Sequence, residues 1–212
     1  MFFDTYKKRS ERYNTLTHAI AAILALPAVI VLLVYASLKG DDAWRIVSFS
    51  IYGLTLFLLY LASSLYHGTN GRRKRIFQRF DHIAIYLLIA GSYTPFTLVA
   101  LNGAWGWSLF GVVWILGVIG IVIDSLHTKG PRSVQLGIYF TMGWMFVVAL
   151  YPLLKNLSVG GLAWLMAGGL LYTIGIIFYA LEGRIRYGHV IWHLFVIAGS
   201  ATHYFTIFHY LL

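Results

Sequence analysis

Apolar residues run through this chain in seven long stretches, and short polar or basic segments separate them. An α-helix needs about 20 apolar residues to cross the roughly 30 Å hydrocarbon core of a bilayer. The stretches that meet this length cover residues 16–38, 45–67, 82–101, 105–125, 134–154, 161–181 and 190–211. The pattern therefore predicts an all-α fold, a bundle of seven transmembrane helices.

The composition indicates that most of the chain lies within a membrane. Hydrophobic residues make up 59% and charged residues 11% of the 212 residues, whereas a soluble domain has about 25% charged residues. The first apolar stretch is longer than the roughly 7–15 residues of a signal-peptide core, so we expect it to be retained. No linker-like segment interrupts the chain. We predict a short basic N-terminus over residues 1–15 and a single membrane domain over residues 16–211.

The basic residues lie mainly on one side of the predicted bundle. Thirteen of the 16 lysines and arginines fall within residues 7–12, 72–79, 129–132 and 184–186. Because Lys and Arg favour the cytoplasmic side, this bias predicts a cytoplasmic N-terminus and an extracytoplasmic C-terminus in a multi-pass protein of the cell membrane. The basic residues that orient the protein in the membrane also account for its net charge of +9. We therefore expect the membrane as a partner and no binding of nucleic acid.

Polar residues gather at the cytoplasmic ends of the predicted helices, where six of the eight histidines fall. Residues three or four apart share a helix face. Three predicted helices therefore each carry a polar stripe at a similar depth: Glu11, Asn14 and His18; Ser63 and His67; and His189 and His193. Ionisable groups inside a membrane usually face the bundle interior. We expect these stripes to converge, together with Asp81 at the start of the third helix.

Two histidines at positions i and i+4 of a helix can chelate one metal ion. His67, at the matching depth, is the natural third ligand for His189 and His193. The chain has no cysteine, so a transition-metal site must use His, Asp or Glu. Zinc held by three protein ligands keeps a fourth position for water, whose pKa falls to about 7, and Asp81 is placed to orient that water. The alternative is that these histidines are hydrogen-bonding polar residues without a metal.

Four segments resemble the bacterial hemolysin III proteins: SERYNTLTH (10–18), ASSLYH (62–67), FDHIAIYLLIAGSYTPF (80–96) and GHVIWHLFVIAGSATH (188–203). These proteins belong with the progestin and adipoQ receptors, which include the adiponectin receptors, and the alkaline ceramidases are more distant relatives. The resemblance covers about residues 10–210. The combination ExxNxxxH, SxxxH, Asp and HxxxH, in this order over seven helices, is specific, whereas its individual pieces are not.

The resemblance implies a seven-helix bundle with a zinc ion near the cytoplasmic face. It implies His67, His189 and His193 as the zinc ligands, and Asp81 as the partner of the zinc-bound water. Ser63, one helical turn before His67, would lie beside the site. The first motif, which comprises Glu11, Asn14 and His18, is interpreted as support, through either contacts to the ligands or helix packing.

Other polar residues of the predicted helices have no counterpart in these motifs. Asp124 and His127 are interpreted as polar groups at the end of the fourth helix. His82, about 100° around the helix from Asp81, is expected to serve packing, and His203 to make a helix–helix hydrogen bond. Glycines in the fourth and sixth helices allow close helix approach within the monomer, and a homodimer face is the alternative reading of the same residues.

Three functions are compatible with this sequence. The first is a zinc-dependent intramembrane hydrolase, similar to a ceramidase, in which activated water attacks a lipid amide or ester that enters from the bilayer, with Asp81 and Ser63 as catalytic residues. The second is a receptor or regulator of membrane state with a structural zinc and a lipid ligand. The third is a hemolysin-type pore-former that acts in cytolysis, which the nearly apolar outer halves of the helices disfavour.

Overall fold

The computed structural model describes residues 2–40, 42–126 and 132–212, with side chains from residue 8 onward in the first helix. All regular elements of these residues are helical. They are α1 (Phe2–Leu38), α2 (Ala43–Gly68), α3 (Gly71–Pro95), η1 (Phe96–Leu101), α4 (Gly103–Leu126), α5 (Arg132–Trp144), η2 (Met145–Ala149), α6 (Leu150–Asn156), α7 (Val159–Ala180) and α8 (Gly188–Tyr210). Seven spans are long and apolar enough to cross a membrane. The predicted all-α bundle of seven transmembrane helices is confirmed.

Two helices begin well before the apolar stretches that predicted them. α1 is already helical at Phe2, so most of the predicted N-terminal segment 1–15 is continuous with the first span. α3 begins at Gly71, which places the basic residues 72–79 on its first turns. The connection before α3 has only Thr69 and Asn70, and this is too short to hold the basic run outside the helix.

Two spans change their helical geometry midway. The third span continues from Pro95, the last residue of α3, into the π-helical η1. The fifth span passes through the 3₁₀ segment η2 before α6, which contains Pro152. A proline has no N–H for the carbonyl four residues earlier, so an α-helical hydrogen bond is lost at each site and the local geometry adjusts.

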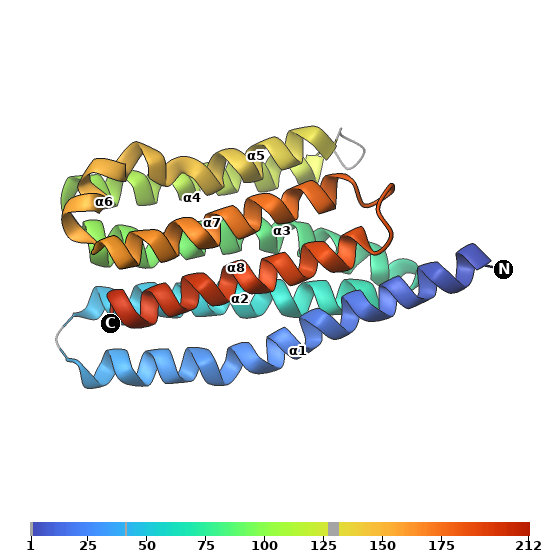
Figure 1. The fold of residues 1–212 in the computed structure, drawn as a ribbon, viewed down its shortest axis with the longest axis horizontal. Helices are drawn as coiled ribbons and strands as arrows, with labels where there is room; N and C mark the ends of the chain where they lie inside the picture. The colour runs from blue at the N-terminus through green and yellow to red at the C-terminus, as the bar shows by residue number, and fades with distance from the viewer. Residues whose placement is uncertain (1, 41, 127–131) are drawn as a thin grey trace.

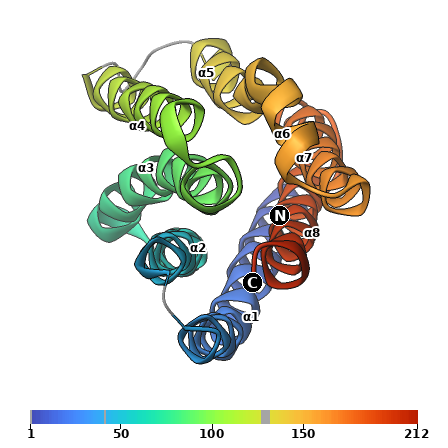
Figure 2. The ribbon, with the colours of Figure 1, turned by 90° about the vertical axis from the view of Figure 1, so that its left-hand side faces the viewer.

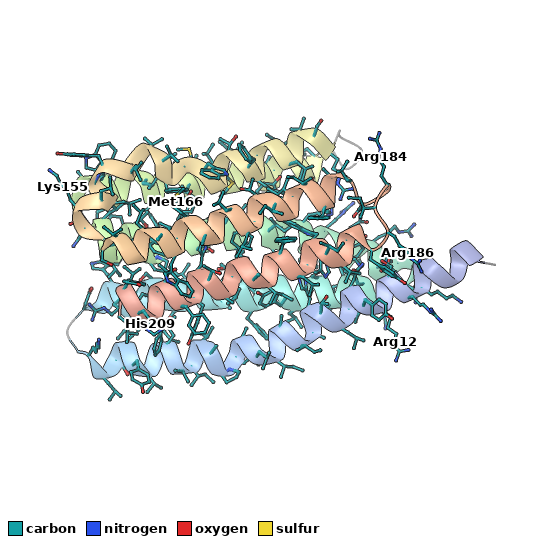
Figure 3. The ribbon with its side chains drawn as sticks, in the orientation of Figure 1. Arg12, Lys155, Met166, Arg184, Arg186 and His209 are labelled. Atoms are coloured by element: carbon teal, nitrogen blue, oxygen red, sulfur yellow. The ribbon has the colours of Figure 1, made fainter. Side chains whose placement is uncertain are left out.

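The helices lie side by side along the long axis of the molecule, with the two termini at opposite ends (Figure 1). Arg12, Arg184 and Arg186 lie at the N-terminal end and Lys155 lies at the other (Figure 3). We call the former the basic end. Viewed along the axis, α1 to α4 follow one another around one side and α5 to α8 around the other, with α8 returning to α1 (Figure 2).

The outer surface of the bundle is apolar. Large side chains are exposed along the first helix, for example Ile23 at 68%, Leu24 at 63% and Leu38 at 77%. The interior, in contrast, contains buried polar side chains such as Asn14 and Ser63, in addition to buried aromatic ones such as Tyr52 and Phe49. A water-soluble protein has the reverse distribution. This pattern is that of a bundle surrounded by lipid, whose polar residues avoid the lipid by facing inward.

Candidate metal centre

Three histidines from two helices converge at the basic end. His67 lies in the last turn of α2, and His189 and His193 lie in the first two turns of α8. One ring nitrogen from each lies within 4.8 Å of the others. His67 and His193 are 7% and 1% exposed. The structure thus brings together the three residues that the sequence predicted as ligands, in an arrangement that could hold a metal ion.

The backbone before α8 sets the position of His189. Tyr187 adopts a left-handed conformation with φ of 60°, and α8 starts directly after it. A Cβ atom on Gly188 would lie 2.9 Å from Cα of Glu182. Because only glycine allows this approach, the chain turns sharply and His189 enters the first turn of α8 beside Glu182.

Each of the three histidines has its Nδ1 atom occupied. Nδ1 of His67 lies 2.9 Å from Oε2 of Glu11, and Nδ1 of His189 lies 2.5 Å from Oε2 of Glu182. Nδ1 of His193 lies 3.1 Å from Oγ1 of Thr17. The Thr17 hydroxyl donates to the Asn14 carbonyl at 3.0 Å, so it accepts from His193. A carboxylate also only accepts, and hence all three rings are protonated on Nδ1.

The Nε2 atoms of the same rings then carry lone pairs, and those of His67 and His189 lie 3.1 Å apart. Two facing lone pairs need a cation between them, either a proton or a metal ion. Two nitrogens bound to one tetrahedral zinc at 2.0–2.1 Å lie about 3.3 Å apart. With the third histidine beside them, the residues present fit a divalent metal, and the separation of up to 4.8 Å among the three is wider than full coordination needs.

Asp81 and Ser63 lie next to the three histidines. Both side chains are buried, at 8% and 1% exposed. The Asp81 carboxylate interacts electrostatically with His67 and His189 and with the Ser63 hydroxyl. Asp81 and Ser63 line the same cavity as His189 and His193. A carboxylate, a hydroxyl and two of the three candidate ligands therefore line one cavity.

The predicted supporting residues of the first motif surround the ligands. Glu11 contacts His67 and also accepts from Nζ of Lys74 at 2.7 Å. Nδ2 of Asn14 lies 3.5 Å from Nδ1 of His67. His18 stacks on His193, with ring centroids 3.7 Å apart and an interplanar angle of 7°. Each of the three residues thus touches a candidate ligand, and none contributes to the three-histidine group itself.

Sequence reasoning gave no role to two residues that hold ligands, Thr17 and Glu182. Glu182 lies on the non-helical connection between α7 and α8, where helical spacing cannot place it. Burial alone would raise the pKa of Glu182, but hydrogen bonds from His189 and Arg132 lower it to about 2. Thr17 carries no ionisable group, so its only signal is its place beside His18 on α1.

His82, interpreted from the sequence as a packing residue, and Asp124, interpreted as a polar group at a helix end, lie in contact with each other. Nδ1 of His82 lies 3.3 Å from Oδ2 of Asp124. Nε2 of Gln135 lies 3.1 Å from the same His82 atom and 3.2 Å from Oδ1 of Asp124. These residues belong to α3, α4 and α5, which the periodicity of single helices does not relate. His127 lies outside the described residues, and His203 makes the expected interhelical hydrogen bond, at 3.3 Å to the Leu165 carbonyl.

A cavity of about 100 Å³ extends from the histidines into the bundle. Its polar end contains Asp81, His189 and His193, and it continues between α3, α5, α7 and α8 to His203. Most of its remaining lining is apolar or aromatic, such as Ile85, Leu88, Ile89, Trp144 and Val196. The cavity is therefore polar beside the histidines and mainly apolar beyond them.

Relatives among known proteins match nearly the whole of this chain. Hemolysin-3 of Bacillus cereus is 42% identical over 205 residues, which cover 96% of this chain and 93% of that protein. Monocyte to macrophage differentiation factor of Homo sapiens is 32% identical over 204 residues, 93% of this chain and 83% of that protein. Adiponectin receptor protein of Drosophila melanogaster is 25% identical over 226 residues, 96% of this chain and 51% of that protein.

The family assignment follows from a match along nearly the whole chain. The sequence model described as Haemolysin-III related matches residues 6–204. This range contains every element of the candidate metal centre, from Glu11 on α1 to His193 on α8. The seven spans and the relatives together identify a multi-pass membrane protein. The chain belongs to the Haemolysin-III related family.

Proposed function

We propose that this protein is a zinc-dependent hydrolase of the cell membrane that cleaves an amide or ester bond of a lipid. His67, His189 and His193 hold the zinc ion, and the basic end faces the cytoplasm. The observation that carries the proposal is the pair of Nε2 atoms, 3.1 Å apart, on rings whose Nδ1 atoms are held by carboxylates.

Zinc is a metal that this donor set suits. Three neutral imidazoles suit zinc, copper, nickel and iron, and catalytic zinc sites commonly have three protein ligands and an open position. The chain has no cysteine to close the site with a thiolate. Within the described residues, Asp81 is the carboxylate that lines the cavity together with His189 and His193, while Glu11 and Glu182 are engaged on the outer nitrogens.

The side chains of the site have separate roles in the proposed reaction. When bound, zinc supplies Lewis acidity, which polarises the lipid carbonyl and makes water a stronger acid at neutral pH. Asp81 accepts the proton of the attacking water as the new C–O bond forms, and Ser63 holds the Asp81 carboxylate in place through its hydroxyl. Asp81 then returns the proton to the leaving amine or alkoxide as the C–N or C–O bond breaks.

The cavity supports a lipid as the substrate. Its polar end is at the histidines and its remaining lining is mainly apolar, which suits the carbonyl of an acyl-lipid and the apolar groups next to it. A hydrophilic substrate would leave its polar groups without partners along this lining, which is costly. The cavity therefore favours an acyl-lipid over a water-soluble ester or amide.

The experiment combines metal analysis with a lipid screen. Purified protein should contain about one zinc per chain and should hydrolyse at least one member of a panel of ceramides and other acyl-lipids. His193→Ala and treatment with a chelator should abolish both zinc content and hydrolysis. A protein that holds zinc but hydrolyses none of the panel would contradict the proposed hydrolysis, while the proposed metal site would still stand.

A structural zinc in a regulator of membrane state is the second candidate function. The three histidines join α2 to α8, and Glu11 and Thr17 add α1 to the same cluster. A metal in this position would bind three helices together whether or not it took part in catalysis. This function is favoured if zinc raises the thermal stability of the protein, no lipid is hydrolysed, and Asp81→Asn leaves the zinc-dependent stability unchanged.

A further inference from the structure

Glu182 joins three elements of the bundle at the basic end. Its Oε2 atom lies 2.5 Å from Nδ1 of His189 on α8, and its Oε1 atom accepts from a guanidinium nitrogen of Arg132 at 2.7 Å. Arg132 is the first residue of α5. Glu182 itself follows the end of α7. Both oxygens of this carboxylate therefore have a partner, and the partners come from different helices.

The Arg132 side chain is fixed on a second side. Its guanidinium carbon lies 3.7 Å from the centroid of the Tyr179 ring. The same ring lies 5.5 Å from the His189 ring, at an interplanar angle of 63°. Planar guanidinium groups commonly combine a carboxylate contact with stacking on an aromatic face. Tyr179 and Glu182 together leave Arg132 little freedom.

His189 is the candidate ligand that most needs an external holder. Its side chain is 19% exposed, compared with 3% for His67, and His193 is 1% exposed as a whole residue. It also lies in the first turn of α8, where a helix has backbone groups without helical partners and frays first. Packing alone therefore restricts His189 less than it restricts the other two ligands.

We propose that Glu182 is a positioning residue of the metal centre, which directs Nε2 of His189 towards His67, and that Arg132 acts through Glu182. The proposal rests on the metal site of the proposed function and extends it to a pair outside the motifs of the sequence. Carboxylates on the outer nitrogen of a ligating histidine fix its tautomer and orientation, and their loss typically costs 10–100-fold in metal affinity.

The test measures zinc affinity by competition with a chromogenic chelator, on the full chain in detergent. Glu182→Ala should weaken zinc binding about 10–100-fold. Glu182→Gln should recover part of this loss, because its amide oxygen still accepts from His189. Arg132→Ala should weaken binding less than Glu182→Ala does. The double variant should be no weaker than Glu182→Ala alone, because Arg132 acts through Glu182.

Cobalt substitution reports the geometry of the ligands independently of activity. The visible absorption bands of the cobalt-loaded protein should change in Glu182→Ala and return towards the wild-type bands in Glu182→Gln. Arg184→Gln is the matched control for Arg132→Ala, because Arg184 is exposed on the connection that carries Glu182 and its loss removes the same positive charge. This control should keep the wild-type zinc affinity and cobalt spectrum.

The outcomes separate this inference from the proposed function. If the wild-type chain binds zinc and Glu182→Ala keeps both its affinity and its cobalt spectrum, the positioning role is overturned and the metal site stands. If Glu182→Ala does not fold, the double variant Glu182→Gln with Arg132→Ala takes its place. The positioning role is then overturned if this double variant keeps the wild-type zinc affinity and cobalt spectrum. A wild-type chain that binds no zinc overturns both.

Discussion

The imidazole of His18 on α1 lies flat against the imidazole of His193 on α8, with ring centroids 3.7 Å apart and planes 7° from parallel. Both ring nitrogens of His18 are buried without a hydrogen-bond partner among the described residues. The ring also contacts Tyr60 at 5.2 Å between centroids. His18 thus supports a candidate ligand through its flat face, and its nitrogens add no hydrogen bond.

This contact predicts that an aromatic ring can replace His18. His18→Phe should keep zinc affinity within about threefold of the wild type, because the stacked face is preserved, whereas His18→Ala should lower it by about tenfold or more as His193 loses its support. Zinc competition on the two purified variants checks this. Equal losses in both would show that the nitrogens of His18 matter and that the stacked face does not suffice.

Removal of the Glu11 carboxylate should weaken the metal centre from the α1 side. Glu11 accepts from His67 at 2.9 Å and from Lys74 at 2.7 Å. Glu11→Ala should lower zinc affinity about 10–100-fold because His67 loses its orienting partner. Arg12→Gln is the control, since Arg12 is exposed next to Glu11. An unchanged affinity in Glu11→Ala would contradict the orienting role.

Asp81 should separate catalysis from metal binding. In the proposed reaction it moves a proton and does not coordinate zinc, so Asp81→Asn should keep one zinc per chain while kcat/KM falls by about 10²-fold or more. Ser63→Ala should cause a smaller fall, because Ser63 acts by holding Asp81. Zinc content and hydrolysis are measured on the same preparation. Full activity in Asp81→Asn would exclude Asp81 as the proton acceptor.

Gly188 should be intolerant of any side chain. A Cβ atom there would lie 2.9 Å from Cα of Glu182 and 3.2 Å from the Phe178 carbonyl oxygen. Gly188→Ala should therefore displace Glu182 from His189, lowering both zinc affinity and thermal stability. Gly183→Ala is the control, because a Cβ atom at Gly183 meets nothing within 4 Å. Equal behaviour of the two variants in melting curves and zinc titrations would refute this prediction.

The cluster of His82, Asp124 and Gln135 should affect stability without affecting the metal. Asp124→Leu removes one partner from each of the other two residues and should lower the free energy of unfolding by about 1–3 kcal/mol, because partly buried polar groups lose a hydrogen-bond partner. Denaturant unfolding measures this change. Zinc affinity should stay at the wild-type value, and a large loss of zinc would link this cluster to the metal centre.

The sequence predicts most of the fold because the membrane imposes a simple rule. A span needs a long apolar stretch, and a polar side chain within it must face the interior. The same rule brought together His67, His189 and His193 as candidates, since their spacing and depth can be read from the chain. Asp81 and Ser63 could be placed nearby for the same reason.

The remaining contacts depend on geometry that one-dimensional spacing does not contain. Glu182 reaches His189 through a sharp turn at Gly188, and His82 meets Asp124 across the packing of two helices. The early start of α3 at Gly71 was missed because charged residues hide a helix from a hydropathy criterion. The residues concerned lie either on another element or outside the apolar stretch, so the pattern within one stretch does not reveal them.

The order of the ligands along the chain has a consequence for biogenesis. His67 ends the second span, while His189 and His193 both lie at the beginning of the last. A nascent chain inserted from its N-terminus can therefore offer one ligand through most of its synthesis, and the complete set becomes available only when α8 enters the bilayer. Metal loading would then mark the end of insertion, and a chain released before α8 would carry its first six spans but no site to fill.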